Sequence, residues 1–199
     1  MSARIYIEGA GDSKELHARC REGFRKLFEK CGFVLRMPKL IASGGRGEAF
    51  EDFKTAHAQG SPADYIALLI DSETPLETLD AAWDHLTAHD HWPRPSSAGD
   101  DQVLFMTTCM ETWIVADHEA LAGHYRHMLQ RSALPSLVDL ERRPRDEVQD
   151  CLARATSRCS NAYLKGRRSF AVLGTLDPEV LGTHLPSFSR VRRILASKL

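Results

Sequence analysis

No stretch of this 199-residue sequence is apolar over the roughly 20 residues that a membrane-spanning helix needs. The first residues also lack the basic stretch and the following apolar stretch of a secretory signal. We therefore expect a cytoplasmic protein that does not enter a membrane.

Several motifs of known chemistry are missing as well. There is no Walker motif, which excludes a P-loop ATPase, and Ser72 lacks the G-x-S-x-G context of a hydrolase nucleophile. None of the five cysteines forms a CxxC pair, so we expect buried, reduced thiols and no structural zinc site. The pairs His85/His89 and His124/His127 have helical spacing but no HExxH context, which favours surface histidines over zinc ligands.

The charge is small overall but unevenly distributed. Apolar residues make up 43% and charged residues 27%, an ordinary composition for a soluble protein with one core. Residues 151–199 hold nine Lys and Arg against two Asp and Glu, a balance of +7, whereas residues 1–150 have a balance of −8. An acidic body with a basic tail suits a metal site near a phosphate-bearing partner. A basic helix face that is simply solvated explains the tail equally well.

Apolar patterning predicts alternating strands and helices. Short apolar runs indicate strands, and apolar residues at helical spacing indicate helices between them. The unbroken run at residues 65–70 is typical of a strand that is covered on both faces. In chain order we predict a strand at 4–7, a helix capped by Asp12 and Glu15 and ended by Gly32, a strand at 39–42, a helix over 49–56, a strand at 65–70, a helix over 79–86, a strand at 103–110 and a helix over 111–125.

This order predicts the fold class. Strand–helix–strand series imply right-handed crossovers and a parallel sheet with helices on both faces. We expect a three-layer, Rossmann-like α/β fold with a mostly parallel sheet. Residues 1–120 would form the core and residues 121–199 a helical C-terminal extension that packs on it within a single domain.

Acidic residues follow the predicted strands. Glu8 follows the first, Asp71 and Glu73 the third, and Glu111 the fourth. Because ligands of open parallel sheets bind at the carboxyl ends of the strands, we expect these four side chains to share one edge. Clustered carboxylates need neutralising, which Mg²⁺, or Mn²⁺ in its place, does through oxygen ligands. Each acid alone is more often a helix cap or a solvated loop end, but their joint placement favours a metal site.

The residues around the first and third strands carry a resemblance. The run Ile5-Tyr6-Ile7-Glu8-Gly9 with Asp12, followed by residues 68–73, resembles the Toprim domain of topoisomerases, primases and OLD-type nucleases. The resemblance implies a Toprim-like fold. It also implies that Glu8 acts as general acid/base and that Asp71 and Glu73 bind metal, with Glu73 in place of the usual second aspartate.

A wider pattern, spread over residues 4–178, resembles an uncharacterised Toprim-like family, domain of unknown function 4276. This family is often encoded beside ATPases in phage-defence loci, which implies an ATPase partner. The segments that carry the resemblance are Gly44-Gly45-Arg46, Asp100-Asp101-Gln102, Cys109-Met110-Glu111-Thr112-Trp113 with Ala116-Asp117, Lys165-Gly166-Arg167-Arg168-Ser169 and Asp177-Pro178.

Basic residues near glycines are candidates for phosphate contacts. A glycine-rich loop at 44–47 precedes a predicted helix, where backbone N–H groups can meet an anion. Arg46 in this loop either contacts substrate or neutralises Asp71, and the sequence favours neither. Lys165, Arg167 and Arg168 concentrate positive charge around a glycine and would seat a nucleic-acid backbone, unless they form an ordinary exposed turn.

We therefore expect a Mg²⁺-dependent nuclease that cleaves nucleic-acid phosphodiesters, DNA or RNA, as an effector of antiviral defence. The main alternative is a non-catalytic or partner-activated subunit that binds an ATPase, with Trp83 and Trp92 serving either an interface or the core. A phosphatase acting on small phosphoesters is a weaker alternative, because the nucleophile context is missing.

Overall fold

The fold is built on one parallel sheet. In the computed structural model, which describes residues 2–9, 11, 13–166 and 168–199, four strands lie in the order β2-β1-β3-β4. All three neighbouring pairs are parallel, which confirms the predicted fold class. The strands are β1 (Ala3–Ile7), β2 (Lys39–Ala42), β3 (Tyr65–Asp71) and β4 (Val103–Met106).

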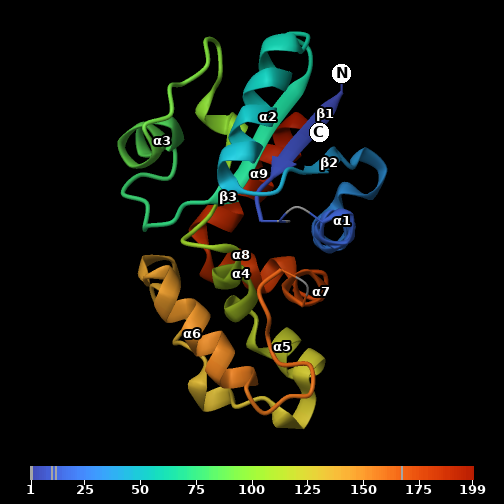
Figure 1. The fold of residues 1–199 in the computed structure, drawn as a ribbon, viewed down its shortest axis with the longest axis vertical. Helices are drawn as coiled ribbons and strands as arrows, with labels where there is room; N and C mark the ends of the chain where they lie inside the picture. Colours follow the sequence, from blue (N-terminus) through green and yellow to red (C-terminus); the bar gives the residue numbers. More distant parts are fainter. Residues whose placement is uncertain (1, 10, 12, 167) are drawn as a thin grey trace.

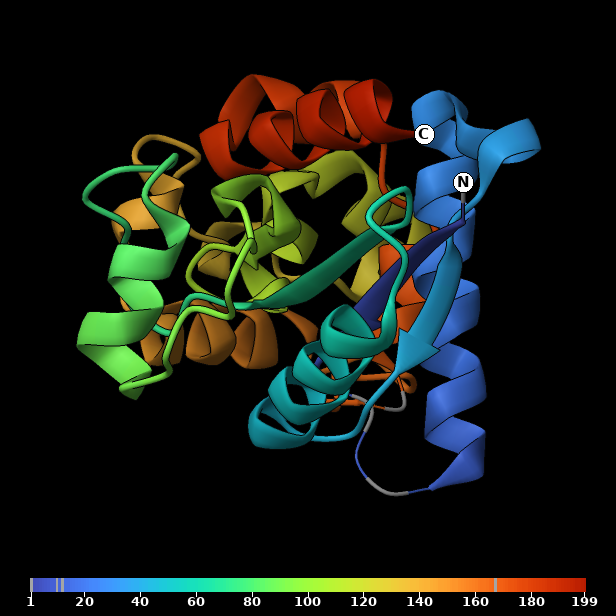
Figure 2. The same ribbon diagram turned by 90° about the horizontal axis from the view of Figure 1, so that it is seen from above.

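Helices cover both faces of the sheet (Figures 1 and 2). The helices α2 (Arg46–Gln59) and α3 (Ala82–Asp90) lie on one face, and α1 (Lys14–Phe28) and α9 (Pro186–Lys198) on the other. Alternate residues of β3 belong to two separate hydrophobic clusters, as expected for a strand whose side chains point alternately to the two faces. Tyr65, Ala67 and Leu69 join the cluster with α1 and α9, whereas Ile66, Leu68 and Ile70 join the cluster with α2 and α3.

The remaining helices gather below the carboxyl ends of the strands, in the lower half of Figure 1. From there the chain returns to the sheet through α9, which packs along β4. These helices are α4 (Met110–Ala116), α5 (His118–Tyr125), α6 (Arg145–Thr156), α7 (Ser169–Leu173) and α8 (Pro178–His184). A π-helical segment follows α1 at Glu29–Phe33, and 3-10 turns lie at Val34–Arg36, Asp100–Gln102, Arg126–Met128, Arg131–Ala133 and Leu140–Arg142.

Two predicted elements are shorter than expected. The fourth strand ends at Met106 and not at residue 110, because its last partner on β3 is Asp71, where that strand also ends. The predicted helix over 111–125 is two helices, α4 and α5. The break falls at Asp117, whose side chain accepts a hydrogen bond from the Ala120 backbone N–H and so starts the second helix.

Two other local predictions need correction. Helix α1 is capped by Ser13, whose hydroxyl accepts from the Leu16 backbone N–H at 3.1 Å, whereas Asp12 lies outside the described residues. Helix α3 begins three residues later than the predicted helix and ends at Asp90, where His91 caps it in a left-handed conformation with φ 58°.

Other expectations are confirmed. Gly32, with φ 91°, breaks the helical conformation four residues after α1 ends, inside the π-helical segment. All five cysteines are free thiols; four are buried and Cys31 is half-buried. Trp83 is buried between the sheet and α2, which makes it a core residue, and the half-buried Trp92 stacks on Phe50 at 4.1 Å. Among the described residues, no helix has both the length and the apolar character to cross a membrane.

Candidate metal centre

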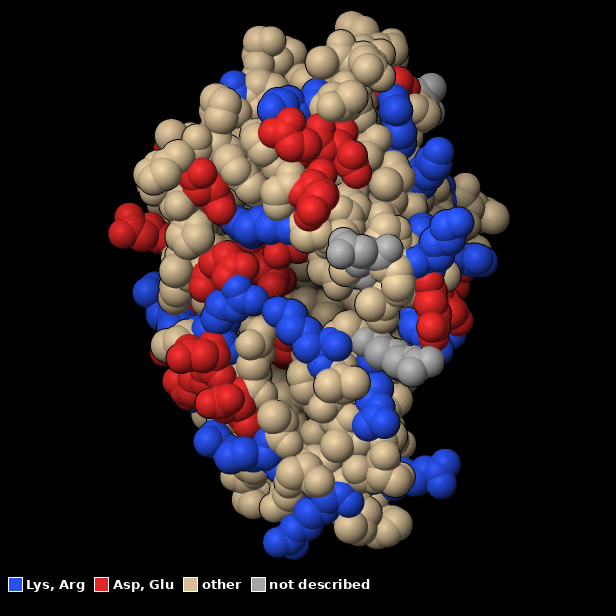
Figure 3. Space-filling view, viewed as in Figure 1, with Lys and Arg blue, Asp and Glu red and all other residues tan. Residues whose placement is uncertain are grey.

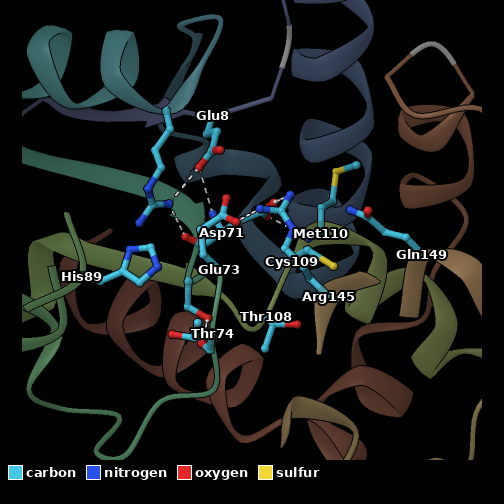
Figure 4. A network of polar contacts seen from close by, with 12 residues as sticks. Glu8, Asp71, Glu73, Thr74, His89, Thr108, Cys109, Met110, Arg145 and Gln149 are labelled. Carbon is cyan, nitrogen blue, oxygen red and sulfur yellow. Dashed lines mark hydrogen bonds and ion pairs between the residues drawn. The ribbon is translucent and has the colours of Figure 1, made fainter. Parts of the chain in front are cut away.

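Three carboxylates converge at the carboxyl edge of the sheet (Figure 4). Glu8 follows β1, Asp71 is the last residue of β3, and Glu73 lies two residues further on. One carboxylate oxygen from each residue lies within 4.8 Å of the other two. We call these residues the acidic trio. The sheet topology brings them together because β1 and β3 are parallel neighbours that end side by side.

The backbone beyond the strands fixes the trio. The Glu8 N–H donates to the Leu69 carbonyl at 3.0 Å, which extends the pairing of β1 and β3 by one residue. The Glu73 N–H donates to the Thr108 carbonyl at 2.9 Å. Glu73 has φ 66°, a left-handed conformation that is uncommon for a residue with a long side chain. The loop after β3 therefore turns sharply and keeps Glu73 beside Asp71.

Arg46, the first residue of α2, anchors one side of the trio. Its guanidinium donates to the Glu8 carboxylate at 3.2 Å and to the Asp71 carbonyl oxygen at 2.5 Å. It also donates twice to the carboxylate of Asp90, both times at 2.8 Å, and lies over the ring of Trp92. Of the two roles left open for Arg46, the structure shows an internal one, with Glu8 and Asp90 as its ion-pair partners.

Arg145, the first residue of α6, approaches the trio from the helical half of the molecule. Its guanidinium lies 3.8 Å from Oδ2 of Asp71 and contacts the carboxylate of Glu73. On the opposite side, Oδ1 of Asp71 accepts a hydrogen bond from the Met110 N–H at 2.8 Å. The first residues of α2, α4 and α6 therefore surround the same cluster of negative charge, an arrangement that helix dipoles favour.

Burial shifts the acids toward their protonated forms. Removal from water is the largest cause that raises the pKa of Asp71 well above its usual value, and the nearby charges of Glu8 and Glu111 add to it. Burial likewise raises the pKa of Glu8, although Arg46 acts in the opposite direction. At both carboxylates burial therefore outweighs the opposing effect of the nearby arginines.

Glu111 lies next to the trio but is engaged elsewhere. It is 1% exposed and sits in the first turn of α4. One of its carboxylate oxygens accepts from the Tyr163 hydroxyl, and the other accepts from the Gln149 side chain at 3.2 Å. The negative charge of Glu111 contributes to the raised pKa of Asp71. The described contacts of Glu111 are those of a supporting residue beside the metal position.

Of the residues predicted to contact phosphate, Lys165 and Arg168 lie in different surroundings. Lys165 is exposed, and its positive charge lowers the pKa of Asp71, so it lies within electrostatic reach of the trio. Arg168 donates to the Ala162 carbonyl at 2.6 Å and so stabilises its own loop. Arg167 lies outside the described residues. Figure 3 shows acidic and basic side chains next to each other around a hollow in the middle of this face.

Several residues of the site could not be found from the sequence. Asp90 and Arg145 lie far from the trio along the chain and belong to no motif. Tyr163 and Gln149, which bind Glu111, come from the helical half.

One of the two histidine pairs has described contacts near the site. His85 donates to the Ser72 carbonyl at 2.9 Å, and its ring stacks on that of His89.

The trio fits a hard divalent cation. All three donors are carboxylate oxygens, the kind of ligand that Mg²⁺ and Mn²⁺ take. Two opposite ligands of a Mg²⁺ ion lie about 4.2 Å apart, so oxygens within 4.8 Å of one another are close to the spacing that one ion needs. The negative charge of the three carboxylates gives a reason for the ion to bind. Glu8, Asp71 and Glu73 are the residues that would hold it.

Comparison with known proteins identifies the family of the chain. A family model, described as a domain of unknown function (DUF4276), matches residues 7–196. The chain belongs to the DUF4276 family. No curated protein matches the chain, and no solved structure matches it either. The DUF4276 match begins at the last residue of β1 and ends within α9, so the trio, strands β2 to β4 and the helical half lie inside it.

Proposed function

We propose that this DUF4276 protein is a Mg²⁺-dependent, Toprim-like nuclease that hydrolyses nucleic-acid phosphodiesters in the cytoplasm. The observation that supports the proposal is the acidic trio, whose oxygens lie within 4.8 Å of one another at the carboxyl edge of a parallel sheet. The order of Glu8 after β1 and of Asp71 and Glu73 at the end of β3 resembles the Toprim pattern, with Glu73 in place of its second aspartate, and in Toprim domains these positions serve nucleic-acid chemistry.

Each residue has a role in this proposal. Asp71 and Glu73, together with Glu8, would hold the ion, and the ion would supply positive charge beside the phosphate. Glu8, whose pKa is raised by burial, holds or releases a proton at its carboxylate. Arg46 orients Glu8 through its 3.2 Å hydrogen bond, and the exposed Lys165 attracts the nucleic-acid backbone.

One observation favours a second candidate function, that of a partner-activated subunit. In the structure Arg46 and Arg145 already pair with the trio, so the site is engaged internally. An ATPase partner that draws Arg145 away would switch the site on. The resemblance to proteins encoded beside ATPases in phage-defence loci suggests such a partner and an antiviral role.

The test is cleavage of a panel of DNA and RNA substrates by the purified protein with Mg²⁺ or Mn²⁺. We expect cleavage by the wild type and its loss in Glu8→Gln and Asp71→Asn, because each substitution removes one charge of the trio and keeps its shape. Glu51→Gln, at an exposed position of α2, is the matched control and should cleave normally. Full activity of Asp71→Asn would exclude the proposed mechanism. Cleavage only after addition of the neighbouring ATPase would favour the partner-activated form.

A further inference from the structure

The two arginines at the trio differ in how firmly they are held. Arg46 makes four hydrogen bonds, two of them to Asp90, and its side chain is 15% exposed. The side chain of Arg145 is 29% exposed. Within the described part of the chain, its ion pairs are with Asp71 and Glu73, both of them members of the trio. Arg46 is therefore fixed by a residue outside the trio, whereas Arg145 depends on the trio itself.

The position of Arg145 in its helix is consistent with its dependence on the trio. It is the first residue of α6, and the first turn also contains Asp146 and Glu147. A positive side chain at a helix N-terminus is disfavoured by the helix dipole, whereas acidic side chains are favoured there. The carboxylates of Asp71 and Glu73 therefore account for the placement of the Arg145 guanidinium, and it loses that support if they bind a cation.

A divalent cation and Arg145 compete for the same carboxylates. Oδ2 of Asp71 and the Glu73 carboxylate face Arg145, and they belong to the residues that would hold the ion. A guanidinium and a divalent cation repel each other strongly at this range in a partly buried site. Binding of the ion must therefore displace Arg145, while Arg46 keeps its bonds to Asp90.

We propose that Arg145 is an exchangeable counterion of the acidic trio, an inference that rests on the proposed function. Without metal it neutralises Asp71 and Glu73. With metal bound it turns away from them and binds a phosphate of the nucleic-acid substrate beside the ion. A guanidinium suits this second role because it binds phosphate through two parallel hydrogen bonds. Its partial exposure leaves it free to reach solvent and substrate.

The test measures binding of Mn²⁺ alone by calorimetry, so that it does not depend on activity. Arg145→Ala should bind Mn²⁺ about tenfold more tightly than the wild type or better, a gain of about 1.4 kcal/mol. Arg145→Lys keeps the charge and should stay near the wild type. Arg154→Ala, which removes an exposed arginine from the same helix, is the matched control and should not change the affinity.

A second measurement follows the phosphate contact. With Ca²⁺ present, Arg145→Ala should bind a short oligonucleotide more weakly than the wild type, although it binds the metal more tightly. A residue that only stabilised the fold would not move these two affinities in opposite directions. If Arg145→Ala is less stable than the wild type without metal, its melting temperature should still rise more on addition of Mn²⁺ than that of Arg145→Lys.

The outcomes separate this inference from the proposed function. If the wild type binds Mn²⁺, Asp71→Asn does not, and Arg145→Ala binds like the wild type, then the exchange is wrong and the metal site stands. If neither the wild type nor Arg145→Ala binds Mn²⁺, the metal site itself is wrong, and the exchange with it.

Discussion

Burial and nearby positive charge have opposite effects on the pKa values of individual acidic side chains in this protein. Burial raises the pKa of Asp71 and Glu8, and the arginines around them act in the other direction. A similar balance occurs away from the trio at Glu141, where burial raises the pKa to about 7 although Ser187 donates hydrogen bonds to the carboxylate. The protonated form of Glu141 therefore suits the folded protein better than the ionised form.

Glu141 gives the first prediction, a dependence of stability on pH. Its pKa is raised from 4.5 to about 7 in the folded state, so its stabilising contribution is full below pH 4.5 and is lost as the pH rises toward 7. The loss is up to about 3 kcal/mol in the free energy of unfolding. Glu141→Gln stays neutral and keeps an acceptor for Ser187.

Chemical denaturation at several pH values measures this effect. The stability of the wild type should fall relative to Glu141→Gln between pH 4.5 and 7, and then run parallel to it. Glu77→Gln, at an exposed position, serves as the control and should follow the wild type. Parallel curves for wild type and Glu141→Gln over the whole range would show that Glu141 ionises normally.

At the scale of elements, close packing of helices holds the two halves of the molecule together. Helix α7 packs on α1, and Gly23 of α1 lies against the backbone of Phe170. A Cβ added at Gly23 would lie 2.5 Å from the Phe170 carbonyl oxygen, a contact that real structures do not contain. The absence of a side chain at Gly23 therefore sets the distance between the two helices.

Gly23→Ala should destabilise the protein by about 1–3 kcal/mol, because the backbone of α7 must shift to admit the methyl group. The control is Gly123→Ala in α5, where a new Cβ meets no atom within 4 Å. That change should be neutral or stabilise by up to about 1 kcal/mol through helix propensity. Thermal melts compare the two variants. Equal stability of Gly23→Ala and the wild type would refute the close approach.

Patterns local in the sequence predicted much of the fold and part of the site. The parallel sheet and the placement of Glu8, Asp71 and Glu73 could be predicted, because each strand and the acid after it are adjacent in sequence. The end of β4 could not, because it depends on where its neighbour β3 stops. Arg145 could not be predicted either, since α6 reaches the trio only through the packing of the helical half.

At the scale of the whole molecule, the C-terminal helix α9 covers the edge strand β4 on one face of the sheet. Arg190 of α9 is 5% exposed and donates to the carbonyl oxygens of Val103 at 2.8 Å and Asp100 at 2.6 Å. It also pairs with Asp80 at 3.0 Å. One buried guanidinium thus connects the last helix, the start of β4 and the loop that precedes α3.

Arg190→Met should lower the free energy of unfolding by about 2–4 kcal/mol, because two carbonyl oxygens lose their donor inside the protein. Arg193→Met is a matched control on the same helix, since Arg193 is exposed and also contacts Asp80. It should change stability by less than about 1 kcal/mol. Denaturant titrations distinguish the two. Similar small losses for both variants would show that Arg190 does not stabilise this edge.

The central claim is that Glu8, Asp71 and Glu73 form a metal site, and anomalous diffraction from a crystal soaked in Mn²⁺ tests it most directly. We predict an anomalous peak between the three carboxylates and an Arg145 side chain turned away from Asp71 and Glu73. An Asp71→Asn crystal soaked in the same way should show no peak. A wild-type crystal without a peak, in which Arg145 still pairs with Glu73, would contradict the account.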